Sequence, residues 1–187
     1  MITHEDIAQL FDLYRSFYPD EGMNFPVLTE QLTDFTTDIC SRKNFRGHII
    51  ADGCVIDPKE KKILMIYHKT LNTWLTPGGH IEASDEHPAD TARREVFEET
   101  GVRVSPVLDE QQEPLLLHMD SYIIPTNEKK QEPRHWHHGM TFLFLADATL
   151  PFPDSRDDGV TGCQWIDIER VHGYERYRVM VDKIQLF

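Results

Sequence analysis

The stretch REVFEETGV at residues 94–102 constrains this chain more than any other. It predicts the end of a helix, because Gly101 fits the position just beyond the last helical residue. At roughly 100° per residue, Glu95, Glu98 and Glu99 fall within a sector of about 100° on that helix. Carboxylates so close together repel one another unless a cation lies between them. The stretch therefore predicts a divalent-cation site, with a solvent-exposed acidic helix face as the alternative.

The residues around this stretch indicate how the helix is placed. Ala92 and Val96 flank the acidic sector, where they would bury the helix against a sheet and aim the glutamates at the sheet edge. The pair Gly78-Gly79 lies upstream, and its backbone can closely approach a metal ion or a phosphate because it carries no side chains. Both features are compatible with a site for a metal ion and a phosphate group.

The hydrophobic pattern predicts strands on both sides of this helix, together with further helices at both ends of the chain. Such an order of elements predicts an α/β fold with one mixed sheet that is covered on both faces. We expect one main domain at 46–187, with residues 1–45 forming an N-terminal helical extension packed on it. The predicted strands are 48–56, 62–68, 114–124, 140–147 and a short one in GCQWIDIERV, and the predicted helices are 3–14, 28–39, 89–100 and 177–186.

Composition excludes several classes of function. The chain of 187 residues has a net charge of -13, which argues against binding of duplex nucleic acid, since that requires a basic face. An anionic substrate would instead need a bound metal ion to supply positive potential. Cys40, Cys54 and Cys163 are isolated, so we expect buried or half-buried free thiols rather than disulfides. No secretory signal or membrane-spanning run is present, and we expect a cytoplasmic protein without a membrane partner.

The region from Gly79 to Val102 reads GHIEASDEHPADTARREVFEETGV and closely resembles the Nudix box, G-x5-E-x7-R-E-U-x-E-E-x-G-U, in which U is apolar. Gly79 lies seven residues before Glu86 rather than six, so we place one inserted residue in the ASDE loop. Trp74 and QWIDIER are similar to the features that flank Nudix boxes, and the resemblance covers roughly residues 46–185. The positions that match the box are Glu86, Arg94, Glu95, Val96, Glu98, Glu99, Gly101 and Val102.

This resemblance implies an α/β/α sandwich with a mixed sheet. It also implies hydrolysis of a nucleoside diphosphate linked to another moiety, with Mg²⁺ or Mn²⁺ as cofactor. Arg94 would hold a glutamate in the conformation that binds metal, and Glu86 would be a supporting group. Carried over by position, the metal ligands would be Glu95, Glu98, Glu99 and the carbonyl of Gly79.

The general base stays open at this point, because it is a glutamate of the box in some Nudix enzymes and an acid of a later loop in others. The later loop here contains Asp154, Asp157 and Asp158, for which a solvated turn is the alternative.

Three histidines precede the strand predicted at 140–147, with His135 and His137 on one side by alternation. These histidines are candidates for contact with substrate phosphate, His137 first among them, or for proton transfer near neutral pH, and a half-exposed strand entrance is the alternative role for His135, His137 and His138.

Two other functions remain as alternatives to hydrolysis. A non-catalytic Nudix module could bind a nucleotide as a sensor, although such modules commonly lose a glutamate of the box and this chain keeps all of them. A diphosphate isomerase on the same fold would need a cysteine beside the substrate, and no cysteine here lies in a suitable motif. In each case we expect a small-molecule partner, and a monomer or a homodimer.

Overall fold

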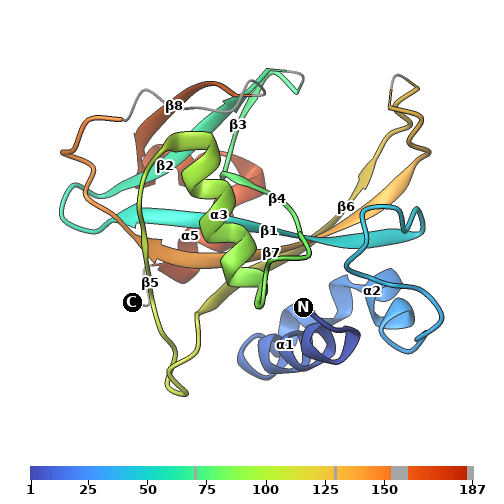
Figure 1. Cartoon of the computed structure of the whole chain (residues 1–187). Coiled ribbons are helices and arrows are strands. Elements are labelled where there is room, and N and C mark those ends of the chain that lie inside the picture. Colours follow the sequence, from blue (N-terminus) through green and yellow to red (C-terminus); the bar gives the residue numbers. More distant parts are fainter. Residues whose placement is uncertain (70, 129, 153–159, 185–187) are drawn as a thin grey trace.

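The structure is a computed structural model that describes residues 1–69, 71–128, 130–152 and 160–184. Figure 1 shows a strongly twisted sheet with the helix α3 lying across one of its faces. The elements are α1 (His4–Phe17), η1 (Pro19–Asn24), α2 (Pro26–Gln31), β1 (Gly47–Asp57), β2 (Lys62–His68), β3 (Thr73–Leu75), β4 (Gly78–His80), α3 (Pro88–Thr100), β5 (Ser105–Pro106), β6 (Leu116–Ile124), β7 (His135–Leu145), β8 (Val160–Asp167), α4 (Ile168–His172), η2 (Glu175–Tyr177) and α5 (Arg178–Ile184).

The sheet is mixed, as the sequence predicts, and β1 lies at its centre. β1 runs parallel to β7 and antiparallel to β2 and β4. β6 and β5 join the sheet through β7, while β8 and β3 join it through β2. β1 is buried along almost its whole length, as expected of a strand covered on both faces.

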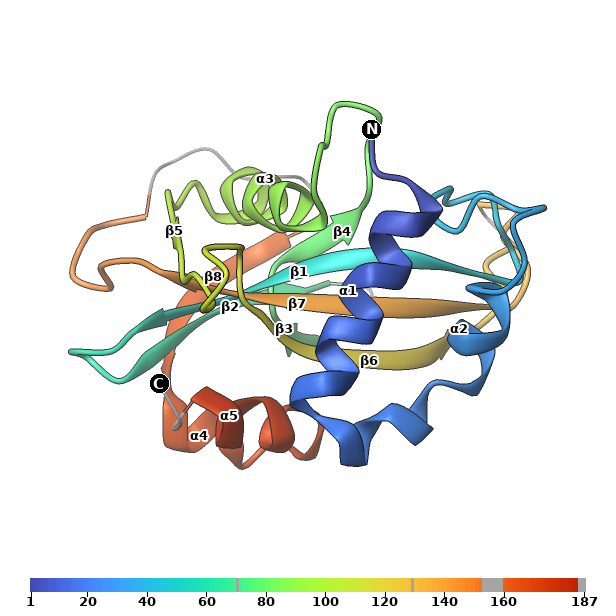
Figure 2. The same cartoon turned by 90° about the horizontal axis from the view of Figure 1, so that it is seen from below.

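Helices cover the two faces of the sheet, which confirms the expected α/β/α layering. Figure 2 shows α3 on one side of the sheet and α4 and α5 on the other. Side chains of β1 alternate between the two layers: Val55 belongs to the core that includes Val96 of α3, whereas Cys54 belongs to the core that includes Met180 of α5. The sheet therefore separates two apolar cores.

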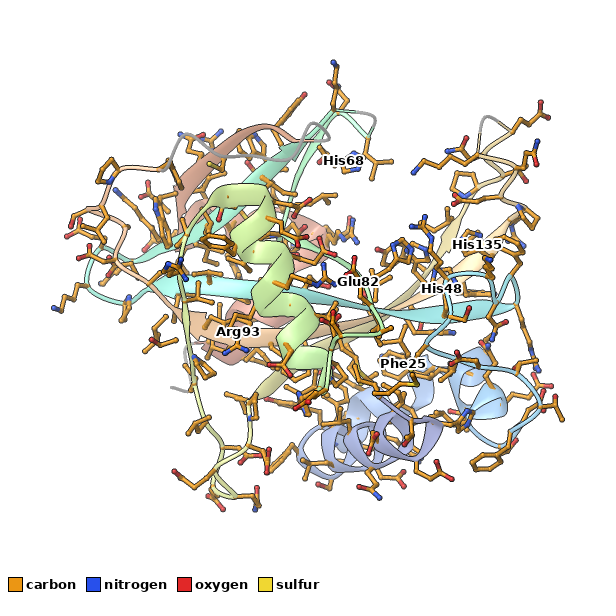
Figure 3. All side chains as sticks on the ribbon, in the orientation of Figure 1. Phe25, His48, His68, Glu82, Arg93 and His135 are labelled. Carbon is orange, nitrogen blue, oxygen red and sulfur yellow. The ribbon has the colours of Figure 1, made fainter. Side chains whose placement is uncertain are left out.

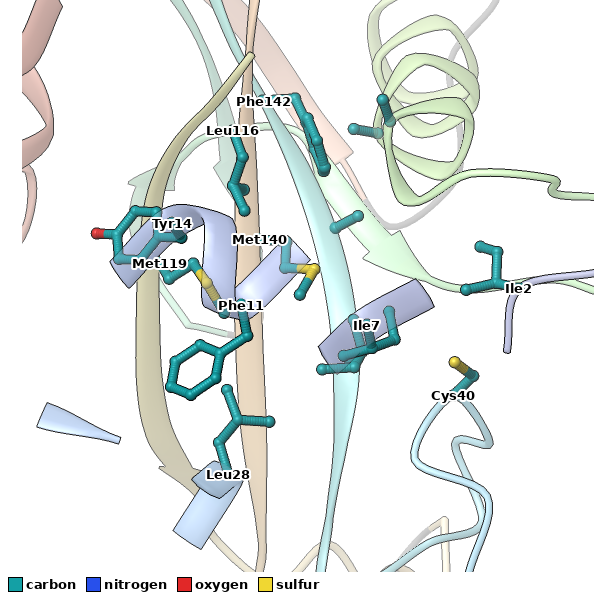
Figure 4. Packing of buried hydrophobic residues seen from close by; sticks show 14 of the residues in the cluster. Ile2, Ile7, Phe11, Tyr14, Leu28, Cys40, Leu116, Met119, Met140 and Phe142 are labelled. Carbon is teal, nitrogen blue, oxygen red and sulfur yellow. The ribbon is translucent and has the colours of Figure 1, made fainter. Parts of the chain in front are cut away.

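The N-terminal helix α1 begins with a capping box, in which Thr3 accepts a hydrogen bond from the backbone N–H of Asp6 and Asp6 accepts one from that of Thr3. Its buried side chains Ile7, Phe11 and Tyr14 pack into the same core as residues of β6 and β7 (Figure 4). Residues 1–45 thus share a core with the sheet, and the boundary between residues 45 and 46 stays a prediction.

Two predicted boundaries are wrong. The helix predicted at 28–39 ends at Gln31. Beyond it, the Asp34 side chain accepts a hydrogen bond from the backbone N–H of Thr36 at 3.0 Å, which favours a turn. Phe35, which the prediction placed on the buried face of the helix, is 66% exposed. The strand predicted at 140–147 begins five residues earlier, at His135, because β7 pairs with both β1 and β6 from that end.

Two further expectations concern the cysteines and the membrane. Cys40 and Cys54 are buried and Cys163 is half-buried, as predicted. None of the helices within the described residues is long and apolar enough to cross a membrane.

Candidate active site

The helix α3 is fixed at both ends and along its buried face. At its start, Nδ1 of His87 accepts a hydrogen bond from the backbone N–H of Ala89 at 3.0 Å, and at its end Gly101 adopts a left-handed φ of 71°. Val96 is fully buried, and it packs so closely on β1 that a Cβ atom on Gly53 would lie 2.5 Å from its Cγ2. This contact sets the direction in which the neighbouring flank of the helix points.

That flank carries the glutamates, and it lies over the turn of Gly78 and Gly79. Oε2 of Glu99 accepts a hydrogen bond from the backbone N–H of Gly78 at 3.0 Å. The carboxylate of Glu95 lies against Gly79 so closely that a Cβ atom there would overlap it. The structure therefore brings both glycines and both glutamates together, and it leaves Glu98 half-exposed beside them.

Arg94 links the glutamates to one another. Its Nη1 donates to Oε1 of Glu95 at 2.9 Å and to Oε2 of Glu98 at 3.1 Å, and its Nη2 donates to the carbonyl of His80 at 2.9 Å. Burial alone would lower the pKa of Arg94, but hydrogen bonds with Asp85 and Glu95 raise it above its ordinary value. A permanent cation thus holds two of the three glutamates in place.

Asp85, and not Glu86, is the acid that supports Arg94. Asp85 is 4% exposed and accepts hydrogen bonds from Nη2 of Arg94 at 3.1 Å and from Oγ1 of Thr91 at 2.8 Å, whereas Glu86 is exposed. Burial raises the pKa of Asp85, but its hydrogen bonds, first the one from Arg94, lower it below its ordinary value. The expectation that Glu86 is the supporting group is therefore wrong.

The spacing agrees with this correction. Counting forward from Gly79, the sixth residue is Asp85, so the glycine-to-acid spacing of the box is intact. The extra residue lies between Asp85 and Arg94, where the loop enters α3, and not before the acid. Aspartate has a shorter side chain than glutamate, and it reaches Arg94 from this lengthened loop.

The electrostatics of the glutamates favour a bound cation. Burial raises the pKa of Glu95 above its ordinary value, although Arg94 opposes this shift and the nearby Glu98 adds to it. A divalent cation among these carboxylates would offset both the burial and the repulsion. Carboxylate oxygens and a backbone carbonyl are the ligands that Mg²⁺ and similar hard cations take in proteins, so the residues present fit such an ion.

A family model described as the NUDIX domain matches residues 47–184. The chain belongs to the Nudix family. Members of this family generally use a divalent metal ion, which agrees with the ligand set around Gly79. The matched region includes every strand of the sheet, and α1 and α2 precede it.

Two similar proteins are named as hydrolases. The chain is 35% identical to a probable DHNTP pyrophosphohydrolase of Lactococcus lactis over half of this chain and 56% of that protein. It is 34% identical to the m7GpppN-mRNA hydrolase NUDT17 of Danio rerio over 67% of this chain and 44% of that protein. It thus spans about half the length of these curated relatives.

Solved structures share the fold at low sequence identity. A Nudix-family hydrolase from Clostridium perfringens superposes with a TM-score of 0.54 at 15% identity, covering 74% of this chain and 97% of that one. The dihydroneopterin triphosphate pyrophosphohydrolase of Escherichia coli gives a TM-score of 0.53, also at 15% identity, covering 74% of this chain and 93% of that one.

The opposite face of the Nudix sheet carries a second group of polar residues, which sequence reasoning missed. Oδ2 of Asp52 accepts hydrogen bonds from Oγ1 of Thr141 at 2.7 Å and from Oγ1 of Thr76 at 3.1 Å. Burial, helped by the nearby Asp120, raises the pKa of Asp52 to about 7. Arg176 lines the same cavity, and its Nη2 lies 3.8 Å from Oδ2 of Asp120. No sequence motif marks these residues, because they come from elements that are distant in sequence and meet only in the folded chain.

The predicted histidines lie within β7 rather than before it. His135 and His137 are on one side of the strand, as expected, and their Nε2 atoms are 3.2 Å apart. His138 points to the other side, where its ring nitrogens contact Ser121 and Gln31. Burial, with the neighbouring histidines, lowers the pKa of His137 to about 2. The expected phosphate contact of His137 stays a prediction.

The loop that contains Asp154, Asp157 and Asp158 lies outside the described residues. The structure therefore gives no position for these candidates for the general base.

Proposed function

We propose that this Nudix protein catalyses the Mg²⁺-dependent hydrolysis of a pyrophosphate bond in a nucleoside diphosphate linked to another moiety. The observation that carries the proposal is the packing of Glu95 and Glu99, with Glu98 beside them, over the backbone of Gly78 and Gly79. Membership of the family and the names of the relatives, a pyrophosphohydrolase and an mRNA hydrolase, support it. Mn²⁺ takes the same oxygen ligands and is expected to replace Mg²⁺.

In this proposal Glu95, Glu98, Glu99 and the carbonyl of Gly79 hold the metal. When bound, the cation would supply positive charge to neutralise the pyrophosphate and would lower the pKa of a water molecule. Arg94 acts on the ligands rather than on the substrate, because its donors are directed to Glu95, Glu98, Asp85 and the His80 carbonyl.

A second role of the chain is to keep the ligands fixed before the metal arrives. Glu99 is 9% exposed and bonded to the backbone of Gly78, so its carboxylate loses little freedom when it binds an ion. Gly79 contributes by lacking a side chain, which lets the Glu95 carboxylate lie against the backbone.

The test is turnover of a panel of nucleotides, nucleotide sugars, ADP-ribose, dinucleoside polyphosphates and dihydroneopterin triphosphate, with and without Mg²⁺. We expect one class to be hydrolysed only with the metal present. Glu99→Gln should lower this turnover at least about 100-fold, because the loss of a metal ligand has a larger effect than the loss of a residue that only orients a ligand. Glu86→Gln, which changes an exposed acid in the loop before α3, is the matched control and should keep the activity.

Two results would contradict the proposal. Full activity of Glu99→Gln would remove the metal site from the reaction. Mg²⁺ and nucleotide binding without any turnover would instead support the sensor function.

A further inference from the structure

Four imidazole rings gather on the face of the sheet opposite α3. His48 in β1 has ring centroids of three others close by: His80 in β4 at 5.1 Å, and His135 and His137 in β7 at 5.0 and 4.7 Å. They meet because His48 and His137 are register partners in the parallel β1–β7 pair, and Ile50, two residues along from His48, is the partner of His80. Figure 3 shows His48 and His135 near each other on the arm of the sheet beyond α3.

One ring nitrogen from each of His48, His135 and His137 lies within 4.8 Å of the others. His48 and His135 are 1% and 4% exposed, and His137 is half-buried. The Nε2 atoms of His135 and His137 are 3.2 Å apart. Two nitrogens bound to one tetrahedral zinc ion at roughly 2.0–2.1 Å would be about 3.3 Å apart, so this pair already has the spacing of two zinc ligands.

The outer nitrogens of two rings are held by backbone carbonyls. Nδ1 of His48 lies 3.2 Å from the carbonyl of Asn44, and Nδ1 of His135 lies 2.7 Å from that of Pro133. An imidazole that donates its Nδ1 proton to a carbonyl presents a lone pair at Nε2, which is how metal-binding histidines are commonly oriented.

The buried Nε2 of His48 is a second, independent sign of a ligand. Among the residues that the structure describes, it has no hydrogen-bond partner, although its ring is almost completely buried. A buried polar atom without a partner destabilises the folded state, and a metal ion bound to its lone pair would remove that cost.

From this geometry we propose that His48, His135 and His137 bind a divalent cation of the zinc class, separate from the cation held by the glutamates. Imidazole nitrogen suits Zn²⁺, Co²⁺, Ni²⁺ and Cu²⁺, whereas Mg²⁺ takes oxygen ligands, so the two sites select different ions. Three protein ligands leave the fourth tetrahedral position for water or another donor, and His80 is the nearest further ring.

The test uses the full chain, without an affinity tag and stripped of metal by a chelator. Co²⁺ is titrated in the presence of excess Mg²⁺, which fills the glutamate site, and binding is followed by visible absorption. We expect the intense bands of tetrahedral Co²⁺, saturation at one ion per chain, and displacement by Zn²⁺. No such bands, or bands that Zn²⁺ leaves unchanged, would overturn the proposal.

Variants assign the site to its ligands. His135→Ala and His137→Ala should each weaken Co²⁺ binding at least about 100-fold, since direct ligands matter more than the groups that orient them. Glu99→Gln and His172→Ala should bind Co²⁺ as the wild-type chain does. His172 is a half-exposed histidine of α4 whose Nε2 lies 3.0 Å from Oδ1 of Asp182. Unchanged binding in both β7 variants would refute the assignment.

A measurement on the wild-type chain covers the case in which the variants do not fold. The X-ray absorption spectrum of the zinc-loaded protein should show nitrogen neighbours at about 2.0–2.1 Å and the outer-shell scattering of imidazole rings. A spectrum of oxygen ligands without imidazole scattering would contradict the proposal. Neither measurement depends on hydrolytic activity, so the glutamate site and the histidine site succeed or fail separately.

Discussion

Replacing Asp85 with alanine should lower the free energy of unfolding by about 3 kcal/mol. The buried carboxylate accepts hydrogen bonds from Arg94 at 3.1 and 3.3 Å, from Thr91 at 2.8 Å and from the backbone N–H of Glu82 at 2.9 Å. Removing one partner of a buried ion pair costs about 3–5 kcal/mol. The lower end applies here because the Arg94 side chain is 19% exposed and keeps its bonds to Glu95 and to the carbonyl of His80.

Urea denaturation measures this effect, with Glu86→Ala as the matched control. Glu86 is the neighbouring acid, and because it is exposed its removal should change the free energy of unfolding by less than about 0.5 kcal/mol. Two-state behaviour is checked by comparing fluorescence with circular dichroism.

A second readout separates positioning from stability. Without Asp85, the guanidinium of Arg94 can shift away from Glu95, so Mg²⁺-dependent turnover by the folded variant should fall about 10- to 100-fold. The reasoning is refuted if Glu86→Ala costs as much stability or turnover as Asp85→Ala, because Glu86 would then occupy the supporting position.

Two further substitutions probe opposite faces of the sheet, at Gly79 in β4 and at Asp52 in β1. Gly79→Ala adds a Cβ atom where the Glu95 carboxylate lies, so Mg²⁺ affinity and turnover should drop while circular dichroism stays that of the wild type; normal turnover would contradict the close contact. In the folded chain the pKa of Asp52 is raised from its ordinary 3.8 to about 7, so ionisation opposes folding. The free-energy cost of ionising Asp52 in the folded chain is absent below pH ~4 and grows between pH ~4 and ~7. Above pH ~7 the cost is complete and reaches about 4 kcal/mol, at 1.36 kcal/mol per pKa unit. Asp52→Asn should therefore gain stability relative to wild type on going from pH 4 to pH 8 in urea denaturation, and a difference that does not change with pH would contradict the assignment.

The sequence predicts α3 to within one residue because local chemistry marks both of its ends. Gly101 stops the helix in a left-handed conformation, and the buried Val96 fixes which flank faces the sheet. β1 is likewise predicted to within one residue at each end, since a strand buried on both faces is rich in apolar residues. The grouping of Glu95 and Glu99 over the glycine pair depends in addition on β4, which pairs with β1.

Other features depend on contacts that no local pattern contains. β7 begins at His135 because it pairs with strands distant in sequence. From the sequence alone its histidines resemble polar loop residues, since only that pairing buries them. Spacing from Arg94 favours Glu86 and spacing from Gly79 favours Asp85, so the box pattern alone cannot place the extra residue. Burial decides between the two acids.

The alternation of a single short strand explains why this chain can carry two sites with different chemistry. In β4, Gly79 is paired with Ala51 on the face covered by α3, where the glutamates of the proposed site would supply oxygen ligands. The next residue, His80, is paired with Ile50 on the opposite face, where its ring joins those of His48 and His137. The carbonyl of His80 also accepts the hydrogen bond from Arg94. The backbone of this one residue therefore supports the glutamate site, while its side chain borders the histidine site.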